Sequence, residues 1–285
     1  MGEEASLPGG LDADFSILQS GLFRPQDLRI CLREGKRSYP PQLRRLIRTA
    51  WQEARLNPLL QLYNGRVASL LAFMEEGVSL RVEVQETDYR SFYGTNICHF
   101  ARIANPALCA NALAVCAVVE TSDGCILIGQ RSGKVAEGAG EWHVPGGNLE
   151  LGRDRGRLEP YFKLYGLTGQ PGAELNPVVQ MSLELSEEAG IGMEDIRQAL
   201  CLGLGQNLHN GKPEFLCWFQ LKPDSRELIT RFRAAPDREE HARLLCLPSE
   251  EIGNFDACYP VTPIGKAALY QFLYFSEVLS AGGVR

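Results

Sequence analysis

Hydrophobic and polar positions alternate in short runs through the first third of the chain. The segments DFSILQ and DLRICLR, and the two apolar runs in RVASLLAFMEEGVSLRVEVQE around a turn at 75–77, have the two-residue period of strands. Between them, PPQLRRLIRTAWQEARLN begins with proline and spaces apolar residues such as Leu43 and Ile47 along one helical face. The peptide TDYRSFYGTN, residues 87–96, leads into a less patterned connection. We therefore expect residues 1–108 to form a smaller α+β region.

The remaining residues, 109–285, continue the α/β pattern and predict one larger domain. ALAVCAVVET and GCILIGQR predict strands around an Asp-Gly turn, and EWHVPGG predicts a strand that runs into a tight loop. Residues 153–175 are rich in glycine, proline and arginine and predict an exposed loop. Asn176, followed by proline, has the position of a helix N-cap, and Gly190 that of the helix stop. Strands at EFLCWFQL and ARLLCLP precede a last helix capped by Thr262.

Composition and charge exclude several functional classes. The 285 residues are 45% hydrophobic, which supplies a sizeable core, and carry a formal net charge of −6, which argues against binding to nucleic acid or to anionic membranes. The nine cysteines form no Cys-x-x-Cys pair and no zinc-type spacing, and they predict reduced thiols. The acidic start MGEEASLPGGLDADF lacks the apolar centre of a secretory signal, and no apolar run approaches the ~18 residues of a membrane span. A cytoplasmic protein is expected.

Three glutamates are crowded near the end of the helix predicted after Asn176. At ~100° per residue, Glu184, Glu187 and Glu188 share one arc beside the apolar face. Like charges at this spacing repel, and acids in the last turn of a helix oppose its dipole by about 0.3–1 kcal/mol each. A bound divalent cation reverses both effects, and carboxylate oxygens suit Mg²⁺, with Mn²⁺ as the alternative. For this peptide alone, a solvated acidic surface is the competing interpretation.

The order of strand, Gly-Gly loop and acidic helix resembles the Nudix hydrolase box. The resemblance implies a Nudix α/β/α sandwich with a mixed sheet. It also implies that Gly147 is the glycine that opens the box, and that Glu184, Glu187 and Glu188 are the catalytic helix acids. In that family these acids, assisted by the glycine carbonyl, bind the Mg²⁺ ions that bridge a substrate diphosphate, and a glycine, here Gly190, ends the motif.

The middle of the box departs from the family pattern. The usual arginine before the first helix acid is Leu183, and the usual loop glutamate is Arg153, although an earlier loop acid is present as Glu150. In addition, 29 residues separate Arg153 from Leu183, where the family's box has seven.

With this long insertion, the box of this chain is similar to the expanded box of the Nudix enzymes that split UDP-glucose and UDP-galactose into UMP and hexose 1-phosphate. Segments similar to theirs are TDYRSFYGTN, VPGG with its following glutamate, KPEFLCWFQ and TPIGKAALY. The likeness touches residues 87–285 and implies a nucleotide-sugar substrate, with residues 1–108 shaping its pocket. Two alternatives stay open: another nucleoside diphosphate derivative such as ADP-ribose, a dinucleotide or coenzyme A, and a nucleotide-sugar sensor without turnover.

Residues outside the helix are expected to choose and orient the substrate. Tyr89, Phe92 and Tyr93 offer flat surfaces for a base, or else pack a joint between the two regions. Asn96 has the donor and acceptor that a uracil edge requires.

Charged residues near the box are the remaining candidates for substrate binding. Arg131 is a candidate for phosphate binding because a strand holds it. The general base is left open among Glu187, Glu150 and Glu214, and the sequence gives no oligomeric state.

Overall fold

The computed structural model describes residues 14–60, 62–232 and 241–281. Its strands are β1 Phe15–Phe23, β2 Leu28–Lys36, β3 Arg66–Glu76, β4 Ser79–Asp88, β5 Ala114–Glu120, β6 Cys125–Arg131, β7 Trp142–His143, β8 Gly146–Asn148, β9 Ile196–Asn207, β10 Pro213–Leu221 and β11 His241–Pro248. Its helices are α1 Pro41–Arg55, α2 Tyr89–Phe92, α3 Arg155–Leu164, α4 Pro177–Ala189, α5 Ser225–Phe232, α6 Ile252–Cys258 and α7 Pro263–Ser280. The nine cysteines are free thiols, as expected.

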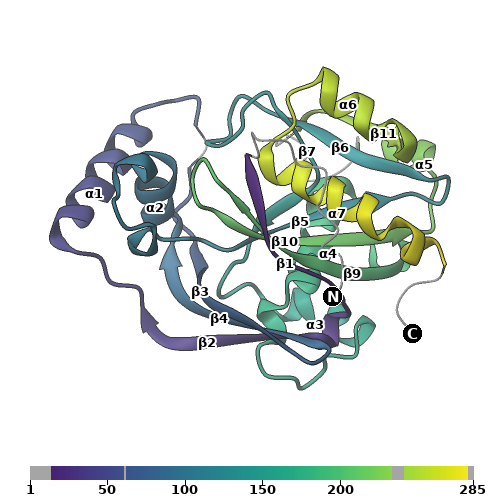
Figure 1. Cartoon of the computed structure of the whole chain (residues 1–285), viewed down its shortest axis with the longest axis horizontal. Coiled ribbons are helices and arrows are strands. Elements are labelled where there is room, and N and C mark those ends of the chain that lie inside the picture. Colours follow the sequence, from purple (N-terminus) through teal and green to yellow (C-terminus); the bar gives the residue numbers. More distant parts are fainter. Residues whose placement is uncertain (1–13, 61, 233–240, 282–285) are drawn as a thin grey trace, which may run out of the picture.

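Two sheets organise these elements (Figure 1). The main sheet has the order β1-β9-β10-β5-β6-β11, and the short strands β7 and β8 pair with β6 and β5. Its β10 and β5 are parallel and its other pairs are antiparallel, so the sheet is mixed. The smaller sheet has the order β2-β4-β3.

Strand β5 lies in the middle of the main sheet and is buried on both of its faces. Its side chains alternate between two hydrophobic cores: Val115, Ala117 and Val119 face one, and Cys116 and Val118 face the other. A strand reads as a continuous apolar run when both of its faces are covered, because side chains alternate with a period of two. The run AVCAVV in this strand is therefore a consequence of its central position.

Helices cover the two faces of the main sheet. From α4, Val178, Met181 and Leu185 pack into the first core, which also contains Leu80 and Val82 of the small sheet. On the opposite face, α6 and α7 pack into the second core. The predicted α/β/α sandwich with a mixed sheet and a smaller N-terminal α+β region is confirmed.

The N-terminal part contributes to both sheets. Its strand β1 pairs with β9 at the edge of the main sheet, while β2, β3 and β4 form the small sheet. The expected division at residue 108 stays a prediction, and residues 1–13 lie outside the described part of the chain. Within that described part, no helix is both long and apolar enough to cross a membrane.

Residues 153–175 are not the exposed loop that their composition predicts. They contain α3, whose first turn is capped by the Asp154 carboxylate, which accepts a hydrogen bond from the Gly156 amide at 2.9 Å. The buried side chains of Leu158 and Phe162 pack against Val179 and Leu183 of α4 in a third core. The prediction was wrong because glycine and proline lowered the apparent helix propensity, whereas burial against α4 stabilises the helix.

The TDYRSFYGTN segment is helical from Tyr89 onward. Helix α2 continues into a π-helical turn, Tyr93–Ile97, which lies against α1. A Cβ atom on Gly94 would lie 2.6 Å from the Ile47 Cα atom, so this glycine permits close packing of the two helices. Figure 1 shows α1 and α2 together at one end of the molecule, opposite α6 and α7.

The N-cap of α4 fixes the start of the helix that carries the acidic cluster. Asn176 is buried, its Oδ1 accepts from the Val178 amide at 3.1 Å, and its Nδ2 donates to the Pro25 carbonyl at 2.7 Å. We expect Asn176→Ala to lower the free energy of unfolding by about 1–3 kcal/mol, because it loses the cap and leaves the Pro25 carbonyl unpaired. Asn176→Ser keeps a capping oxygen and should lose less. Urea denaturation of both variants measures the difference, and equal stability of Asn176→Ala and wild type would contradict it.

Candidate active site

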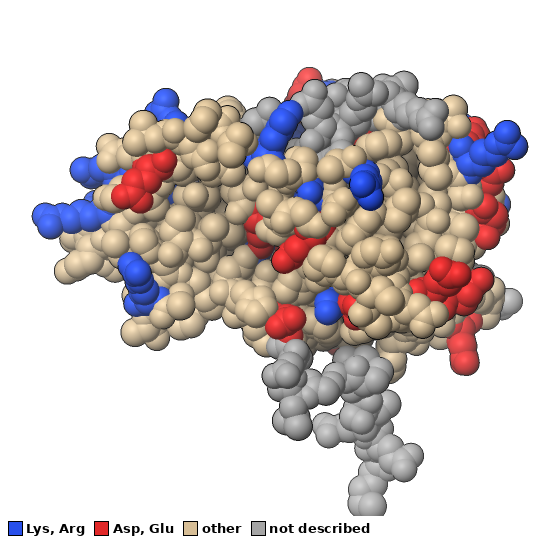
Figure 2. Space-filling view, turned by 90° about the horizontal axis from the view of Figure 1, so that it is seen from above, with Lys and Arg blue, Asp and Glu red and all other residues tan. Residues whose placement is uncertain are grey.

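A pocket of about 280 Å³ is lined by residues of β3, α2, β6, β8, α4 and β10. It brings together eight of the eleven residues predicted for the site: Tyr89, Phe92, Arg131, Gly147, Glu150, Glu184, Glu188 and Glu214. Residues far apart in the sequence therefore line one pocket. Figure 2 shows acidic and basic side chains next to one another across the middle of the face seen there, with no broad basic patch among the described residues.

Two consecutive glycines bring the β8 backbone close to its neighbours. A Cβ atom on Gly147 would lie 2.7 Å from Glu184 Oε1, and one on Gly146 would lie 2.8 Å from the Val115 carbonyl oxygen. Contacts this short exclude any side chain at either position without rearrangement. The Gly-Gly pair thus lets the Glu184 carboxylate pack directly against the strand that enters the pocket.

Glu184 and Glu188 are buried carboxylates near the end of α4. Their exposed fractions are 8% and 5%, and α4 ends at Gly190 in the left-handed conformation, as predicted. Burial raises the pKa of Glu184, and although Arg153 opposes this shift, nearby Glu188 adds to it. Two buried carboxylates one helical turn apart need positive charge nearby.

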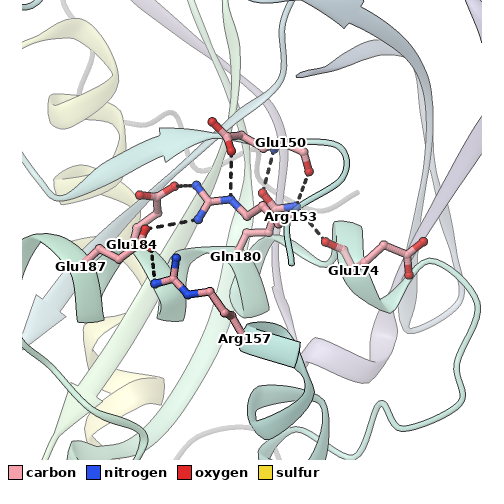
Figure 3. Close-up of polar contacts among 7 residues, drawn as sticks. All are labelled: Glu150, Arg153, Arg157, Glu174, Gln180, Glu184 and Glu187. Carbon is pink, nitrogen blue, oxygen red and sulfur yellow. Dashed lines mark hydrogen bonds and ion pairs between the residues drawn. The ribbon is translucent and has the colours of Figure 1, made fainter. Parts of the chain in front are cut away.

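Arg153 supplies positive charge to this cluster (Figure 3). Its guanidinium group forms an ion pair with Glu184, and also lies 3.4 Å from Glu187 Oε2 and 3.3 Å from Glu150 Oε2. Burial disfavours the charge on Arg153, but the three carboxylates outweigh that cost and raise its pKa. Arg153, at the position of the usual loop glutamate, is therefore a cation within the cluster of Glu150, Glu184 and Glu187.

A second buried charge network forms another wall of the pocket. The Lys212 ammonium lies 3.1 Å from Glu214 Oε1 and 3.1 Å from Glu137 Oε2. Burial alone would lower the pKa of Lys212, but the two carboxylates raise it. Sequence analysis missed Lys212, which lies immediately before β10 and two residues before Glu214, a spacing that puts both side chains on the same side of an extended backbone.

Glu214 also lies beside Cys116 and His143, with candidate ligand atoms of the three within 4.8 Å of one another. Burial and nearby Glu214 raise the pKa of the Cys116 thiol well above its usual range. The His143 ring shares a 2.5 Å hydrogen bond between Nδ1 and Thr262 Oγ1. Glu214 is already paired with the Lys212 ammonium, and we assign no metal to this group.

Three predicted site residues do not line the pocket: Glu187, Tyr93 and Asn96. Glu187 pairs with Arg157 at 2.5 Å and lies 3.4 Å from the Arg153 guanidinium. Tyr93 packs edge-on against Trp51, with ring centroids 6.1 Å apart.

Asn96 has no polar atom left for a substrate. It is 1% exposed, its Nδ2 donates to the Asn210 carbonyl at 2.8 Å, and its Oδ1 accepts from the Asn111 amide at 3.0 Å. The prediction that this amide reads a uracil edge does not fit the geometry, because its hydrogen bonds join distant segments of the fold.

The donor set of the pocket fits a hard divalent cation. Glu184 and Glu188 supply carboxylate oxygens from one face of α4, and Gly147 brings backbone close to them. The cluster is already arranged around a cation, since Arg153 lies among its carboxylates. All-oxygen sites of this kind prefer Mg²⁺ or Mn²⁺ to zinc.

Comparison with known proteins gives one sequence relative and several weak structural ones. No family model matches the chain. The chain is 27% identical over 205 residues to a protein named Nudix hydrolase 9 from Arabidopsis thaliana, a match that covers 66% of this chain and 64% of that protein. The chain thus spans slightly less than two thirds of the curated relative that it matches.

The structural similarities are low. DR0079 from Deinococcus radiodurans has a TM-score of 0.38 and 16% identity, with 72% of this chain and 96% of that chain covered. A Nudix hydrolase from Nitrosomonas europaea has a TM-score of 0.35 and 19% identity, with 57% and 88% covered. The MutT protein from Methanosarcina mazei Go1 has a TM-score of 0.33 and 16% identity, with 58% and 94% covered.

The close approach of Gly147 and Glu184 predicts the effect of one added methyl group. We expect Gly147→Ala to displace the Glu184 carboxylate and to weaken Mn²⁺ binding by about tenfold or more, since ~1.4 kcal/mol of lost interaction suffices. A titration followed by electron paramagnetic resonance of free Mn²⁺ measures the affinity. Gly253→Ala is the matched control, because nothing lies within 4 Å of its Cβ position in α6. Unchanged Mn²⁺ affinity in Gly147→Ala would show that Glu184 is not positioned by this contact.

Proposed function

We propose that this protein hydrolyses the diphosphate bond of a nucleoside diphosphate derivative, with Mg²⁺ or Mn²⁺ as the required cation. The observation that carries the proposal is the meeting of Glu184, Glu188 and Gly147 in one pocket that is also lined by Arg131 and Lys134. Carboxylates that hold a cation, next to basic side chains, are suited to a substrate with adjacent phosphates.

Glu184 and Glu188 would hold the cation, with the Gly147 carbonyl assisting. When bound, a divalent cation neutralises diphosphate oxygens and makes a coordinated water more acidic. Arg131 is positioned to contact a phosphate, because its Nε donates to the Glu137 carbonyl at 2.9 Å, which fixes the guanidinium at the pocket wall.

The three candidates for the general base differ in their positions relative to the pocket. Glu150 and Glu214 line the pocket and Glu187 does not. The Glu214 side chain is 6% exposed, whereas the Glu150 side chain is 41% exposed. We therefore propose Glu150 as the group that accepts a proton from the attacking water, because it can exchange protons with solvent.

A UDP-sugar is the substrate that we propose within this class. Support comes from the similarity of several segments to Nudix enzymes that act on UDP-glucose and UDP-galactose, and from the aromatic wall of the pocket. Tyr89 is partly exposed there, with its ring centroid 5.8 Å from that of the buried Phe92. Tyr89 would stack on the base and Phe92 would support it. Residues 1–108 would act in this way as a substrate-shaping region.

The helix carboxylates should be required for turnover but not for folding. We expect Glu184→Gln and Glu188→Gln each to lower kcat/KM with Mg²⁺ by about 100-fold or more, because loss of a ligand removes several kcal/mol of charge stabilisation. Circular dichroism should show an intact fold. Glu194→Gln, at an exposed position outside the pocket, is the control. Full activity in either helix variant would refute the assignment.

The identity of the products separates the substrate hypotheses. Across a panel of UDP-glucose, UDP-galactose, ADP-glucose, ADP-ribose, a dinucleotide and coenzyme A, we expect the highest kcat/KM for a UDP-sugar, with UMP and hexose 1-phosphate as products. In ¹⁸O-labelled water the label should enter a phosphate group and not the sugar carbon.

Other results of the same assay would redirect the proposal. Preference for another panel member would keep the diphosphate reaction and change the substrate. Free hexose with UDP would refute attack at phosphorus, and binding without turnover would identify a nucleotide-sugar sensor.

A further inference from the structure

The Arg153 guanidinium lies where the site would hold a cation. It is 12% exposed in its side chain and contacts carboxylates from two elements, Glu150 on the loop after β8 and the pair Glu184 and Glu187 on α4 (Figure 3). Guanidinium groups form strong charge-assisted hydrogen bonds with carboxylates and remain charged when partly buried. Arg153 therefore neutralises a cluster whose negative charges would otherwise repel one another.

The backbone that carries Arg153 is anchored independently of its side chain. Buried Gln180 accepts a hydrogen bond from the Glu150 amide at 2.8 Å and donates to the carbonyls of Glu150 and Glu174, each at 2.8 Å (Figure 3). The loop can thus stay in place while the arginine side chain changes rotamer.

Two cations, the Arg153 guanidinium and the proposed divalent ion, compete for the Glu184 carboxylate. This carboxylate is paired with Arg153, and it is also a proposed ligand of the divalent ion. Two cations in contact with one carboxylate repel each other, and this repulsion is strong in a site of low dielectric constant. We infer that Arg153 is a displaceable internal counter-ion, which must release Glu184 before the divalent cation binds. The inference rests on the proposed function.

The surroundings give the displaced guanidinium alternative partners. Glu150, with a side chain 41% exposed, lies on the solvent side of the cluster, and Glu187 lies outside the pocket lining. Arg153 can keep either contact when it leaves Glu184. Metal affinity is then the result of an exchange of cations, and the metal-free protein keeps a neutralised cluster.

Direct Mn²⁺ binding tests the exchange without any measurement of turnover. The full chain is stripped with EDTA, and Mn²⁺ is titrated with detection of the free ion by electron paramagnetic resonance. We expect Arg153→Gln to bind Mn²⁺ about tenfold more tightly than wild type, which corresponds to ~1.4 kcal/mol. Its metal-free form should melt at a lower temperature than wild type, and Mn²⁺ should raise that temperature by more.

Two further variants serve as controls. Arg157→Gln removes an arginine that pairs with Glu187 alone among the helix acids and whose side chain is 55% exposed, and it should leave Mn²⁺ affinity close to that of wild type. Arg153→Lys keeps the charge but loses the fork that spans Glu184 and Glu187, so its affinity should lie between those of wild type and Arg153→Gln. If Arg153→Gln does not fold, the order of Arg153→Lys and wild type decides the question.

The outcomes separate this inference from the proposed function. If wild type binds Mn²⁺ and the Arg153 variants bind it equally or more weakly, Arg153 is not a competitor, and the inference fails while the metal site stands. If neither wild type nor any variant binds Mn²⁺, the metal site fails and the inference fails with it.

Discussion

Two carboxylates are buried at the end of α4, where both the helix dipole and their mutual repulsion oppose negative charge. The neighbouring structure compensates for this unfavourable arrangement. Arg153 brings positive charge to Glu184, and Gly147 leaves the space that the carboxylate occupies. The apolar face of α4 is meanwhile fixed in the core between the two sheets. The helix is thus stable enough to hold acids at an otherwise costly position.

Features set by local chemistry could be predicted from the sequence. The alternation of β5, the Asn176 cap, the Gly190 stop and the arc of acids on α4 each depend on residues within one turn or one strand of each other. The Gly-Gly loop was recognisable for the same reason. These signals, together with the resemblance to the Nudix box, sufficed for the fold class and for eight of the residues that line the pocket.

Features set by contacts between distant segments could not be predicted. The hydrogen bonds of Asn96 connect it to Asn111 and Asn210, and no local pattern announces those partners. Lys212 pairs with Glu137, which lies 75 positions earlier in the chain. Helix α3 was hidden by glycine and proline in its sequence, and its stability comes from packing against α4.

The Gln180 side chain helps the fold to accommodate the long segment between Glu150 and Glu174. Its amide ties Glu150 and Glu174 to the same position on α4, so the segment between them leaves and rejoins the site at one point. A segment whose two ends are held together can become longer at a small cost in free energy, because the entropy of loop closure grows only with the logarithm of its length. Geometrically, the two ends of the interrupted motif remain neighbours even though they are distant in the chain. The Gly-Gly loop and the acid-bearing helix α4 therefore stay adjacent in three dimensions despite the long segment between them.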